Sequence, residues 1–179
     1  VRALMKKTHP FHEHADVEFF IARGADGRVT GRISAAVNHA HNDYHNEKTG
    51  FFGFLECEND EKLAALLLET AEKWVRERGM DRIRGPFNLS TNEECGLLVD
   101  GFNTDPRLMM PHNPPWLGGL VEKAGYGKAV DLLAYWADGD ENDFEKLFRV
   151  ADMVKRRGNW TVRGINMKDL KNEMRRVMD

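Results

Sequence analysis

Three consecutive segments decide the fold: Thr49-Gly-Phe-Phe-Gly-Phe-Leu-Glu-Cys57, the stretch from Lys62 to Arg78, and Met80-Asp-Arg-Ile-Arg84. The first segment is rich in aromatic residues and predicts a strand. The second has apolar residues at steps of three and four, which predicts a helix that ends at Gly79. The third predicts a short strand entered directly from that helix. A strand, a helix and a strand of this length favour a parallel, right-handed crossover.

The segments before this crossover predict a β-hairpin. The stretch from Asp16 to Arg23 is rich in strand formers, Asp26 and Gly27 form a turn signal, and the stretch from Val29 to Val37 alternates apolar with polar or small residues. A hairpin followed by a strand, a helix and a strand predicts a mixed, twisted sheet flanked by helices, in the α+β or α/β class.

The chain after Pro86 begins with a long stretch rich in Asn, Gly and Pro, and connections of this length are usually functional. The stretch ends at Pro114 and Pro115, which predict the start of a helix that stops at Gly125. A strand is then predicted from Val130 to Trp136.

An acidic linker, Asp138-Gly-Asp-Glu-Asn-Asp143, predicts a boundary between a first domain at 1–137 and a further segment at 138–179. The chain does not begin with Met and closes on a helical pattern, so we expect a fragment of a longer protein. The elements predicted in the further segment are a helix at 144–157, a short strand at 160–163 and a helix at 167–178.

Composition places the chain among folded globular proteins. It has 179 residues, of which 41% are hydrophobic and 31% charged, and its formal net charge of −3 gives no overall electrostatic footprint for nucleic acid. Its apolar runs are too short to span a membrane, and its first residues lack the apolar core of a secretory leader. Cys57 and Cys95 are too far apart for a zinc or redox pair, so we expect both to be reduced and the compartment to be the cytoplasm.

Four of these stretches resemble the central half of a GCN5-related N-acetyltransferase (GNAT) domain: Gly53-Phe-Leu-Glu-Cys-Glu58, Ala65 to Gly79, Asp81-Arg-Ile-Arg84, and Leu120-Val-Glu-Lys-Ala-Gly-Tyr126. The region from His9 to Trp136 is similar to a little-characterised bacterial branch of that superfamily. The phrases that carry the branch resemblance are Asn92-Glu-Glu-Cys-Gly96, Asp100-Gly-Phe102 and Met110-Pro-His-Asn-Pro-Pro115. The resemblance implies a GNAT-like fold, in which the first strand and helices are missing before Val1.

The resemblance also implies a reaction and a cofactor. In the superfamily, a thioester of coenzyme A lies in a splayed V between two parallel strands, and an amine attacks its acyl carbonyl directly. The pyrophosphate of the coenzyme binds backbone N–H groups at a helix N-terminus. The implied cofactor is acetyl-CoA or another acyl-CoA, and the implied cofactor-binding residues are Phe54, Leu55, Lys62, Leu63 and Ala64.

The sequence departs from the superfamily pattern at two places. Counted back from Gly79, the pyrophosphate motif falls on Asn59, Lys62 and Ala64, and only Ala64 matches. Lys62 replaces the glycine that lets the backbone approach phosphate. Val121 stands where many relatives carry a tyrosine that protonates the leaving thiolate. These departures predict weak use of acyl-CoA without a change of fold.

Two carboxylates, Glu56 and Glu58, lie at the carboxyl end of the first strand of the crossover, where open α/β sheets bind their ligands. The alternation of a strand places them on the same face as Phe52 and Phe54, so either is a candidate catalytic base for an amine. The alternative is that both are solvated carboxylates before a helix, where they favour the positive end of its dipole.

The long connection supplies the candidates for substrate binding. Asn92 and Glu93 could contribute polar contacts, with a structural turn as the alternative, and Cys95 beside them has no adjacent histidine to activate its thiol. His112 and Trp116 could line an acceptor pocket, as a polar side and a flat apolar wall. The alternative for these two residues is the start of a proline-capped helix.

The histidines fall into two groups, and three imidazoles together can bind zinc or nickel. In an extended segment His39 and His41 would point to one side. No Cys or carboxylate spacing completes a known zinc pattern, so we predict no metal, and substrate contact is the other interpretation. The two groups are His9, His12 and His14, and His39, His41 and His45.

Two classes of function follow from the sequence. The first is an acyl-CoA-dependent N-acyltransferase acting on a small-molecule amine, with backbone groups from Phe54 to Glu56 polarising the carbonyl. The second is a catalytically reduced module that binds a small ligand or pairs with a related domain beginning at Trp160 or with a second copy. We expect neither a membrane nor a nucleic acid as partner, and the basic patch from Lys155 to Arg157 is interpreted as a solvated helix face.

Overall fold

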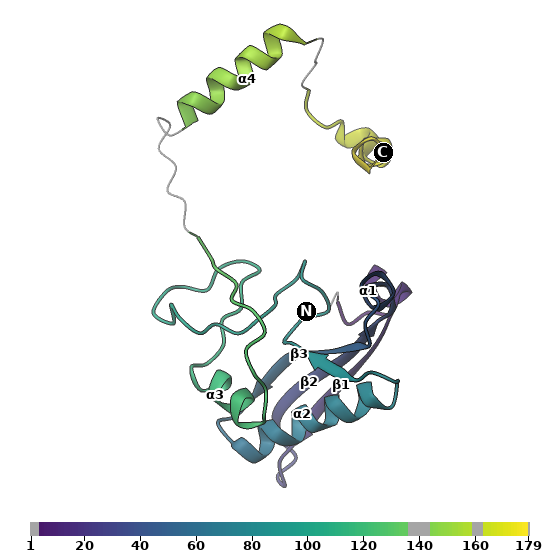
Figure 1. Ribbon diagram of the computed structural model, residues 1–179, viewed down its shortest axis with the longest axis vertical. Helices are drawn as coiled ribbons and strands as arrows, with labels where there is room; N and C mark the ends of the chain where they lie inside the picture. The colour runs from purple at the N-terminus through teal and green to yellow at the C-terminus, as the bar shows by residue number, and fades with distance from the viewer. Residues whose placement is uncertain (1–3, 136–143, 159–162, 179) are drawn as a thin grey trace. The chain divides into compact units, whose positions relative to one another are not determined.

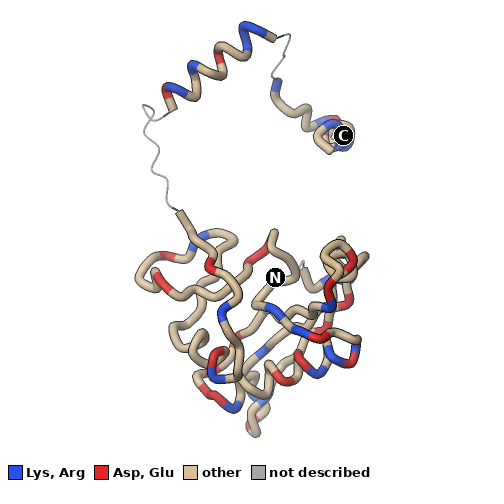
Figure 2. Tube along the Cα trace, viewed as in Figure 1, with Lys and Arg blue, Asp and Glu red and all other residues tan. Residues whose placement is uncertain are grey.

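The computed structural model describes residues 4–135, 144–158 and 163–178 (Figure 1). The chain divides into two compact units, Val1–Leu132 and Leu133–Asp179. The first unit contains a sheet with its covering helices, and Figure 2 shows that positively and negatively charged residues are interspersed along its chain.

A four-stranded, twisted mixed sheet forms the centre of the first unit, with the strands in the order β1-β2-β3-β4. Strand β2 is antiparallel to both of its neighbours, β1 and β3, and β4 runs parallel to β3, with Thr49 opposite Arg82 and Phe51 opposite Arg84. The predicted hairpin and the predicted parallel pair are therefore confirmed. The strands are β1 (Ala15–Arg23), β2 (Val29–Asn38), β3 (Thr49–Cys57) and β4 (Arg82–Arg84).

The crossover helix α2 (Glu61–Arg76) joins β3 to β4 and packs across one face of the sheet (Figure 1). The Asp60 side chain accepts hydrogen bonds from two backbone N–H groups of the first turn, which fixes the start of the helix. Gly79 adopts a φ of +80°, a conformation in which glycine lets the chain turn back toward the sheet. The predicted helix is confirmed, with its regular part ending at Arg76.

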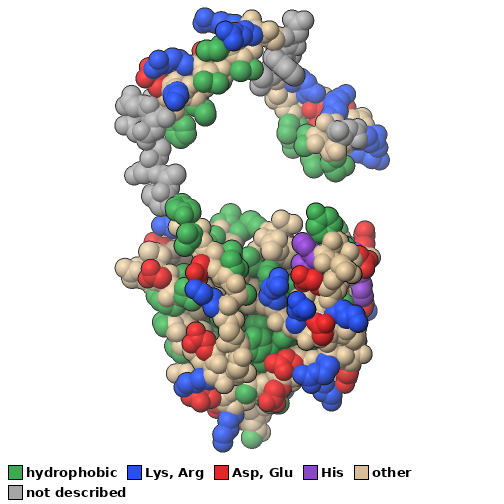
Figure 3. All heavy atoms as spheres, viewed as in Figure 1, with side chains coloured by type: hydrophobic (Ala, Val, Ile, Leu, Met, Phe, Trp, Pro, Cys, Tyr) green, Lys and Arg blue, Asp and Glu red, His purple; other side chains and the backbone are tan. Residues whose placement is uncertain are grey.

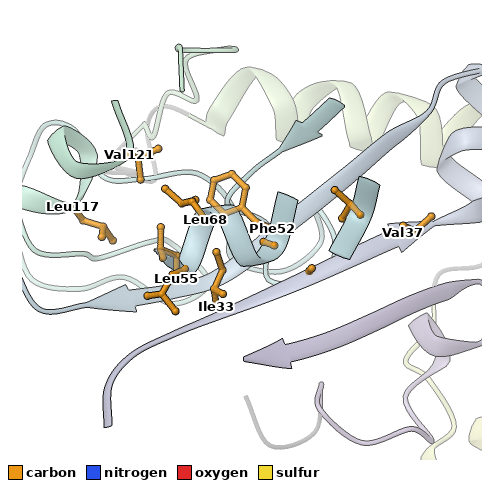
Figure 4. Close-up of a cluster of buried hydrophobic side chains, with 11 residues drawn as sticks. Ile33, Val37, Phe52, Leu55, Leu68, Leu117 and Val121 are labelled. Atoms are coloured by element: carbon orange, nitrogen blue, oxygen red, sulfur yellow. The ribbon is translucent and has the colours of Figure 1, made fainter. Parts of the chain in front are cut away.

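The main core lies between α2 and the sheet (Figure 4). Helix α3 (Trp116–Lys123) adds side chains to this core, and it matches the helix predicted after Pro115. The apolar residues that repeat along α2 and those that alternate along β2 pack together in one cluster, so their apolar surface is removed from water. The labelled members of the cluster are Ile33, Val37, Phe52, Leu55, Leu68, Leu117 and Val121.

A smaller cluster covers the opposite face of the sheet and contains Phe11, Ala15, Phe54 and Leu89. The 3-10 helix η1 (Pro10–Glu13) contributes Phe11 to it. Phe52 therefore packs in one cluster and Phe54 in the other, so the prediction that these two side chains share a face is wrong. The cause is an irregularity in β3, where Phe54 has a φ of +48° and the alternation of side chains is interrupted.

The segment around His39 is also different from its prediction. It forms helix α1 (His39–His45) instead of an extended strand, because the Asn38 side chain accepts a hydrogen bond from the His41 N–H and caps the first turn. Inside this helix the buried Asn42 binds both the N–H and the carbonyl of Thr49 through its amide. This pairing attaches α1 to the start of β3.

The strand predicted from Val130 to Trp136 is wrong for the described residues 130–135, which have no regular secondary structure. Alternating apolar residues form a strand only where a ladder partner is present, and within the described ranges this segment has none. Trp136 itself, and residues 160–162 of the other predicted short strand, lie outside the described residues.

The second unit contains helices where the sequence predicts them. These are α4 (Glu145–Arg157) and, after a short 3-10 turn η3 (Met167–Asp169), α5 (Leu170–Met178). A search of the described residues finds no helix with the length and apolar character needed to cross a bilayer.

The close contact between Gly53 and the Phe87 main chain predicts that replacing Gly53 by alanine and replacing Gly119 by alanine will change the stability of the protein very differently. A β-carbon on Gly53 would lie 1.7 Å from the Phe87 carbonyl oxygen, whereas a β-carbon on Gly119 in α3 has no atom within 4 Å. Gly53→Ala should lower the free energy of unfolding by more than about 3 kcal/mol, because backbone must move. Gly119→Ala should raise it by about 0.5–1 kcal/mol through helix propensity. Urea unfolding followed by tryptophan fluorescence measures both, and equal effects of the two substitutions would contradict the observed contact.

Candidate functional site

A β-bulge in β3 places a main-chain donor, the Phe54 N–H, outside the ladder near the predicted site. Arg32 lies opposite Glu56 and Ser34 opposite Gly53, so the interval on β3 is one residue longer than on β2. The extra residue bends the strand and turns the Phe54 N–H out of the antiparallel ladder.

Asn88 holds this donor. The Phe54 N–H donates to the Asn88 Oδ1 at 2.8 Å, and the Asn88 Nδ2 donates to a Glu94 carboxylate oxygen at 3.1 Å. The loop after β4 is also fixed to the sheet by main chain, since the Phe87 N–H donates to the Phe52 carbonyl at 2.7 Å. Beyond the short β3–β4 ladder, the loop after β4 is thus attached to β3 by one main-chain bond and by the Asn88 side chain. Of these two attachments, the side chain can be displaced more easily.

Of the predicted cofactor-binding residues, Phe54, Leu55 and Ala64 are buried. Phe54 contributes its backbone N–H at the bulge, while the Leu55 side chain belongs to the main core. The Phe54 backbone N–H is therefore a candidate donor near the carboxyl end of β3, whereas the Leu55 and Ala64 side chains serve packing.

The N-terminus of α2 is already satisfied by the chain itself. The Asp60 Oδ1 accepts the Lys62 N–H at 2.8 Å and the Leu63 N–H at 3.0 Å, and the Ala64 N–H donates to the Asp60 carbonyl at 3.0 Å. Glu61 adds a second carboxylate, which forms an ion pair with Lys123 of α3. A pyrophosphate here would displace the Asp60 cap and meet two negative charges, so these residues do not fit that group of coenzyme A.

The two predicted bases are both paired with arginines from β2 and the turn before it. A Glu56 carboxylate oxygen lies 2.7 Å from Arg32, and a Glu58 carboxylate oxygen lies 2.8 Å from Arg28. Both carboxylates are exposed. Glu56 follows Phe54 by two residues and so shares its face of the sheet, whereas Glu58 lies beyond the end of the strand.

The predicted substrate-binding residues lie in two places. Asn92 is in an exposed turn, in which its N–H and that of Glu93 both donate to Ser90. His112 lines an open hollow of about 310 Å³ together with Phe102 and the Asn113–Pro115 segment. Trp116, predicted as the apolar wall, does not line this hollow, and Phe102 supplies the aromatic side instead. The sequence signal for Phe102 was the motif Asp100-Gly-Phe102, which is part of the family resemblance.

Tyr126 provides no substitute for the tyrosine missing at Val121. Its hydroxyl donates to a Glu72 carboxylate oxygen at 2.9 Å, and its ring packs against Phe52. Burial, and then the bond to Glu72, raise the pKa of the Tyr126 phenol far above its usual value. This hydroxyl serves the helix-to-sheet contact and is a poor proton donor for a leaving thiolate.

The sequence interpretation missed the particular environment of His41. Its ring lies 4.4 Å from that of His45 and 5.0 Å from that of Phe51, centre to centre. Its buried Nε2 lies 3.8 Å from a Glu47 carboxylate oxygen, which is too far for a hydrogen bond. Burial, and then the neighbouring His45, lower the pKa of His41 below the usual 6.5. In the part of the chain that the structure describes, no three His, Cys, Asp or Glu side chains come together as a metal site.

The lowered pKa of His41 predicts a pH-dependent stability. Between the unfolded pKa of 6.5 and the lower folded value, the unfolded chain binds more protons than the folded one. The free energy of unfolding should therefore fall as the pH drops below about 6.5. His41→Phe, which keeps a ring against Phe51, should weaken this dependence in urea titrations at several pH values. An unchanged pH profile in the variant would contradict the assignment to His41.

The capped start of α2 predicts weak binding of acyl-CoA, in the high micromolar range or worse. Asp60→Ser keeps a capping oxygen but removes a charge, and Glu61→Gln removes a second charge and releases Lys123. Each change should raise the affinity for acetyl-CoA about fivefold, because about 1 kcal/mol of repulsion is removed. Glu69→Gln, an exposed charge two turns further along α2, should leave it unchanged. Calorimetric titration measures these affinities, and submicromolar binding by the unmodified protein would contradict the prediction.

Comparison with known proteins gives two relatives. No family model matches the chain, and no solved structure matches it. The chain is 36% identical over 167 residues to Protein YghO of Escherichia coli K12, which covers 93% of this chain and 42% of that protein. It is 47% identical over 138 residues to the bacterial ceramide synthase of Caulobacter vibrioides, which covers 76% of this chain and 35% of that protein. The chain is thus a homologue of both proteins and spans less than half the length of each.

Proposed function

We propose that this protein is an acyltransferase with a GNAT-like fold that joins an acyl group to an amine. The similarity to a bacterial ceramide synthase carries the proposal. A ceramide is the fatty amide of a long-chain amino alcohol, so the synthesis of one requires acyl transfer to an amine. The sheet, in which β4 lies parallel to β3 after a helical crossover, supports the same class of fold.

The bulge in β3 is the proposed place of the reacting carbonyl. Attack by an amine puts negative charge on the carbonyl oxygen, and a fixed N–H donor stabilises that charge. The Phe54 N–H is such a donor, and at present it binds the Asn88 amide oxygen at 2.8 Å. An acyl carbonyl can replace that oxygen by rotation of one side chain, without breaking the ladder between β2 and β3.

Glu56 is the proposed proton acceptor. An amine arrives as an ammonium ion and must lose a proton before its nitrogen can attack. Glu56 lies on the face of β3 that carries Phe54, and Arg32 orients its carboxylate through a 2.7 Å contact. Glu56 would take one proton from the ammonium group before the attack. The nitrogen then bonds to the acyl carbon, the bond between that carbon and the thioester sulfur breaks, and a second proton from the nitrogen passes through solvent to the leaving thiolate, which departs as the free thiol.

The acyl donor is proposed to be an activated thioester of the acyl-CoA class. The N-terminus of α2 takes no part in holding it, because Asp60 and Glu61 occupy that position. His112 and Phe102, which line the open hollow, are the proposed contacts for the acceptor.

A catalytically reduced module that binds a small ligand is the second candidate function. The Asp60 cap on α2 favours it, because this end of the helix is stabilised internally and needs no ligand. The bond between Tyr126 and Glu72 favours it as well, since this bond engages the Tyr126 hydroxyl, which is therefore a poor proton donor for a leaving thiolate.

Amide formation distinguishes the two candidates. The purified protein, incubated with acyl-CoA donors of several chain lengths and with short- and long-chain amines, should release an N-acylated amine detectable by mass spectrometry. Glu56→Gln should lower kcat by about a hundredfold or more, as expected for loss of a general base. Glu18→Gln, a matched exposed carboxylate on β1, should leave kcat unchanged. Amide formation that is insensitive to Glu56→Gln would remove Glu56 from the mechanism, and no amide from any pair of substrates would favour the reduced module.

A further inference from the structure

Helix α4 has an apolar face that no described part of the second unit covers. None of its residues is buried, and the side chains of Leu147, Phe148 and Val154 are between half and two-thirds exposed. At 3.6 residues per turn, Leu147 and Val154 lie two turns apart on the same side, and Ala151 lies between them. Figure 3 shows the hydrophobic side chains of α4 gathered along one side of the helix.

The rest of the α4 surface is basic. The helix has five Lys or Arg residues against two Asp or Glu residues, and three of the five form its last turn. One acidic residue, Glu145, is already paired with Arg149 at 3.1 Å. Positively charged side chains therefore dominate the polar side of α4 and its C-terminal end. The basic residues are Lys146, Arg149, Lys155, Arg156 and Arg157.

Helix α5 repeats this arrangement independently. Leu170, Met174 and Val177 are exposed at steps of four and three, which places them on one side. Its single glutamate, Glu173, is buried between Arg163 and Arg176 and is neutralised by them. Both described α-helices of the second unit are thus amphipathic with a basic polar side.

We propose that α4 lies on the surface of an anionic lipid bilayer, with its apolar face among the acyl chains and its Lys and Arg side chains against the headgroups. An exposed apolar face flanked by basic residues is the signature of such interfacial helices. The 13 residues of α4 form a rod about 20 Å long, which fits in the plane of the interface. The inference rests on the proposed function in one respect: the long-chain amino alcohol of a ceramide, one kind of amine acceptor, is an amphiphile that resides in membranes.

Charge and shape favour the bilayer over two other partners. A nucleic acid would neutralise the basic side but would leave Leu147 and Val154 in water. A second copy of α4 would cover the apolar face but would bring two basic helices together. An anionic bilayer satisfies both sides of the helix at once. The sequence predicts no membrane partner, both because no segment can span a bilayer and because the formal net charge of the chain is −3. The proposal departs from that prediction, because the positive charge is concentrated on α4.

Vesicle co-sedimentation of the full chain tests the proposal. Vesicles of phosphatidylcholine with about one-third phosphatidylglycerol should bind the protein at least about tenfold more tightly than vesicles of phosphatidylcholine alone. Binding should weaken as salt is raised, because exposed charges are screened. Leu147→Glu should reduce binding about tenfold or more. Met153→Glu is the matched control, since it makes the same change of charge about 120° away around the helix, on the basic side. It should reduce binding much less.

The outcomes separate this proposal from the proposed function. Equal losses for Leu147→Glu and Met153→Glu would show that charge alone drives association and would overturn the interfacial helix. Absence of vesicle binding, or binding of RNA in its place, or a dimer that Leu147→Glu dissociates, would overturn it as well. An active enzyme that does not bind vesicles leaves the acyltransferase standing, and a protein that binds vesicles without forming amide leaves the interfacial helix standing.

Discussion

The close approach of two stretches of main chain, at Gly53 in β3 and Phe87 after β4, is the constraint on which the site depends. No side chain can be placed between them, because a β-carbon on Gly53 would overlap the Phe87 carbonyl. The contact holds the loop after β4 against the bulge and so brings Asn88 to the Phe54 N–H. This one backbone contact positions the Phe54 N–H, the proposed donor to the oxyanion, and Asn88, its present acceptor. It also fixes where the parallel ladder between β3 and β4 ends.

The sequence predicts much of the fold because periodicity and turn residues act locally. The apolar repeat of α2, the Asp-Gly turn between β1 and β2, and the stops at Gly79 and Gly125 are each read from a few adjacent residues. The face reversal at Phe54 could not be read in this way, since nothing in the aromatic run marks which residue adopts a positive φ. The helix at His39 was missed because its cap, Asn38, also suits the end of a strand.

The candidate site is less predictable than the fold for a related reason. The residue types at the start of α2 suggest repulsion of phosphate, but only the structure shows that Asp60 uses the same N–H groups a phosphate would need. Glu56 and Glu58 are visible in the sequence as carboxylates, whereas their pairing with Arg32 and Arg28 depends on the register between β2 and β3. The role of Asn88 has no local sequence signal, because its partner is 34 residues away.

Two asparagines, Asn42 and Asn88, act as substitutes for missing strand residues along β3. Asn42 binds both main-chain groups of Thr49 beyond the last residue paired with β2, and Asn88 binds the Phe54 N–H beyond the ladder with β4. Open main-chain groups at a sheet edge are templates on which other chains add strands and aggregate. At these two positions an amide from the same molecule occupies the main-chain groups, so Thr49 and Phe54 do not offer them for intermolecular strand addition.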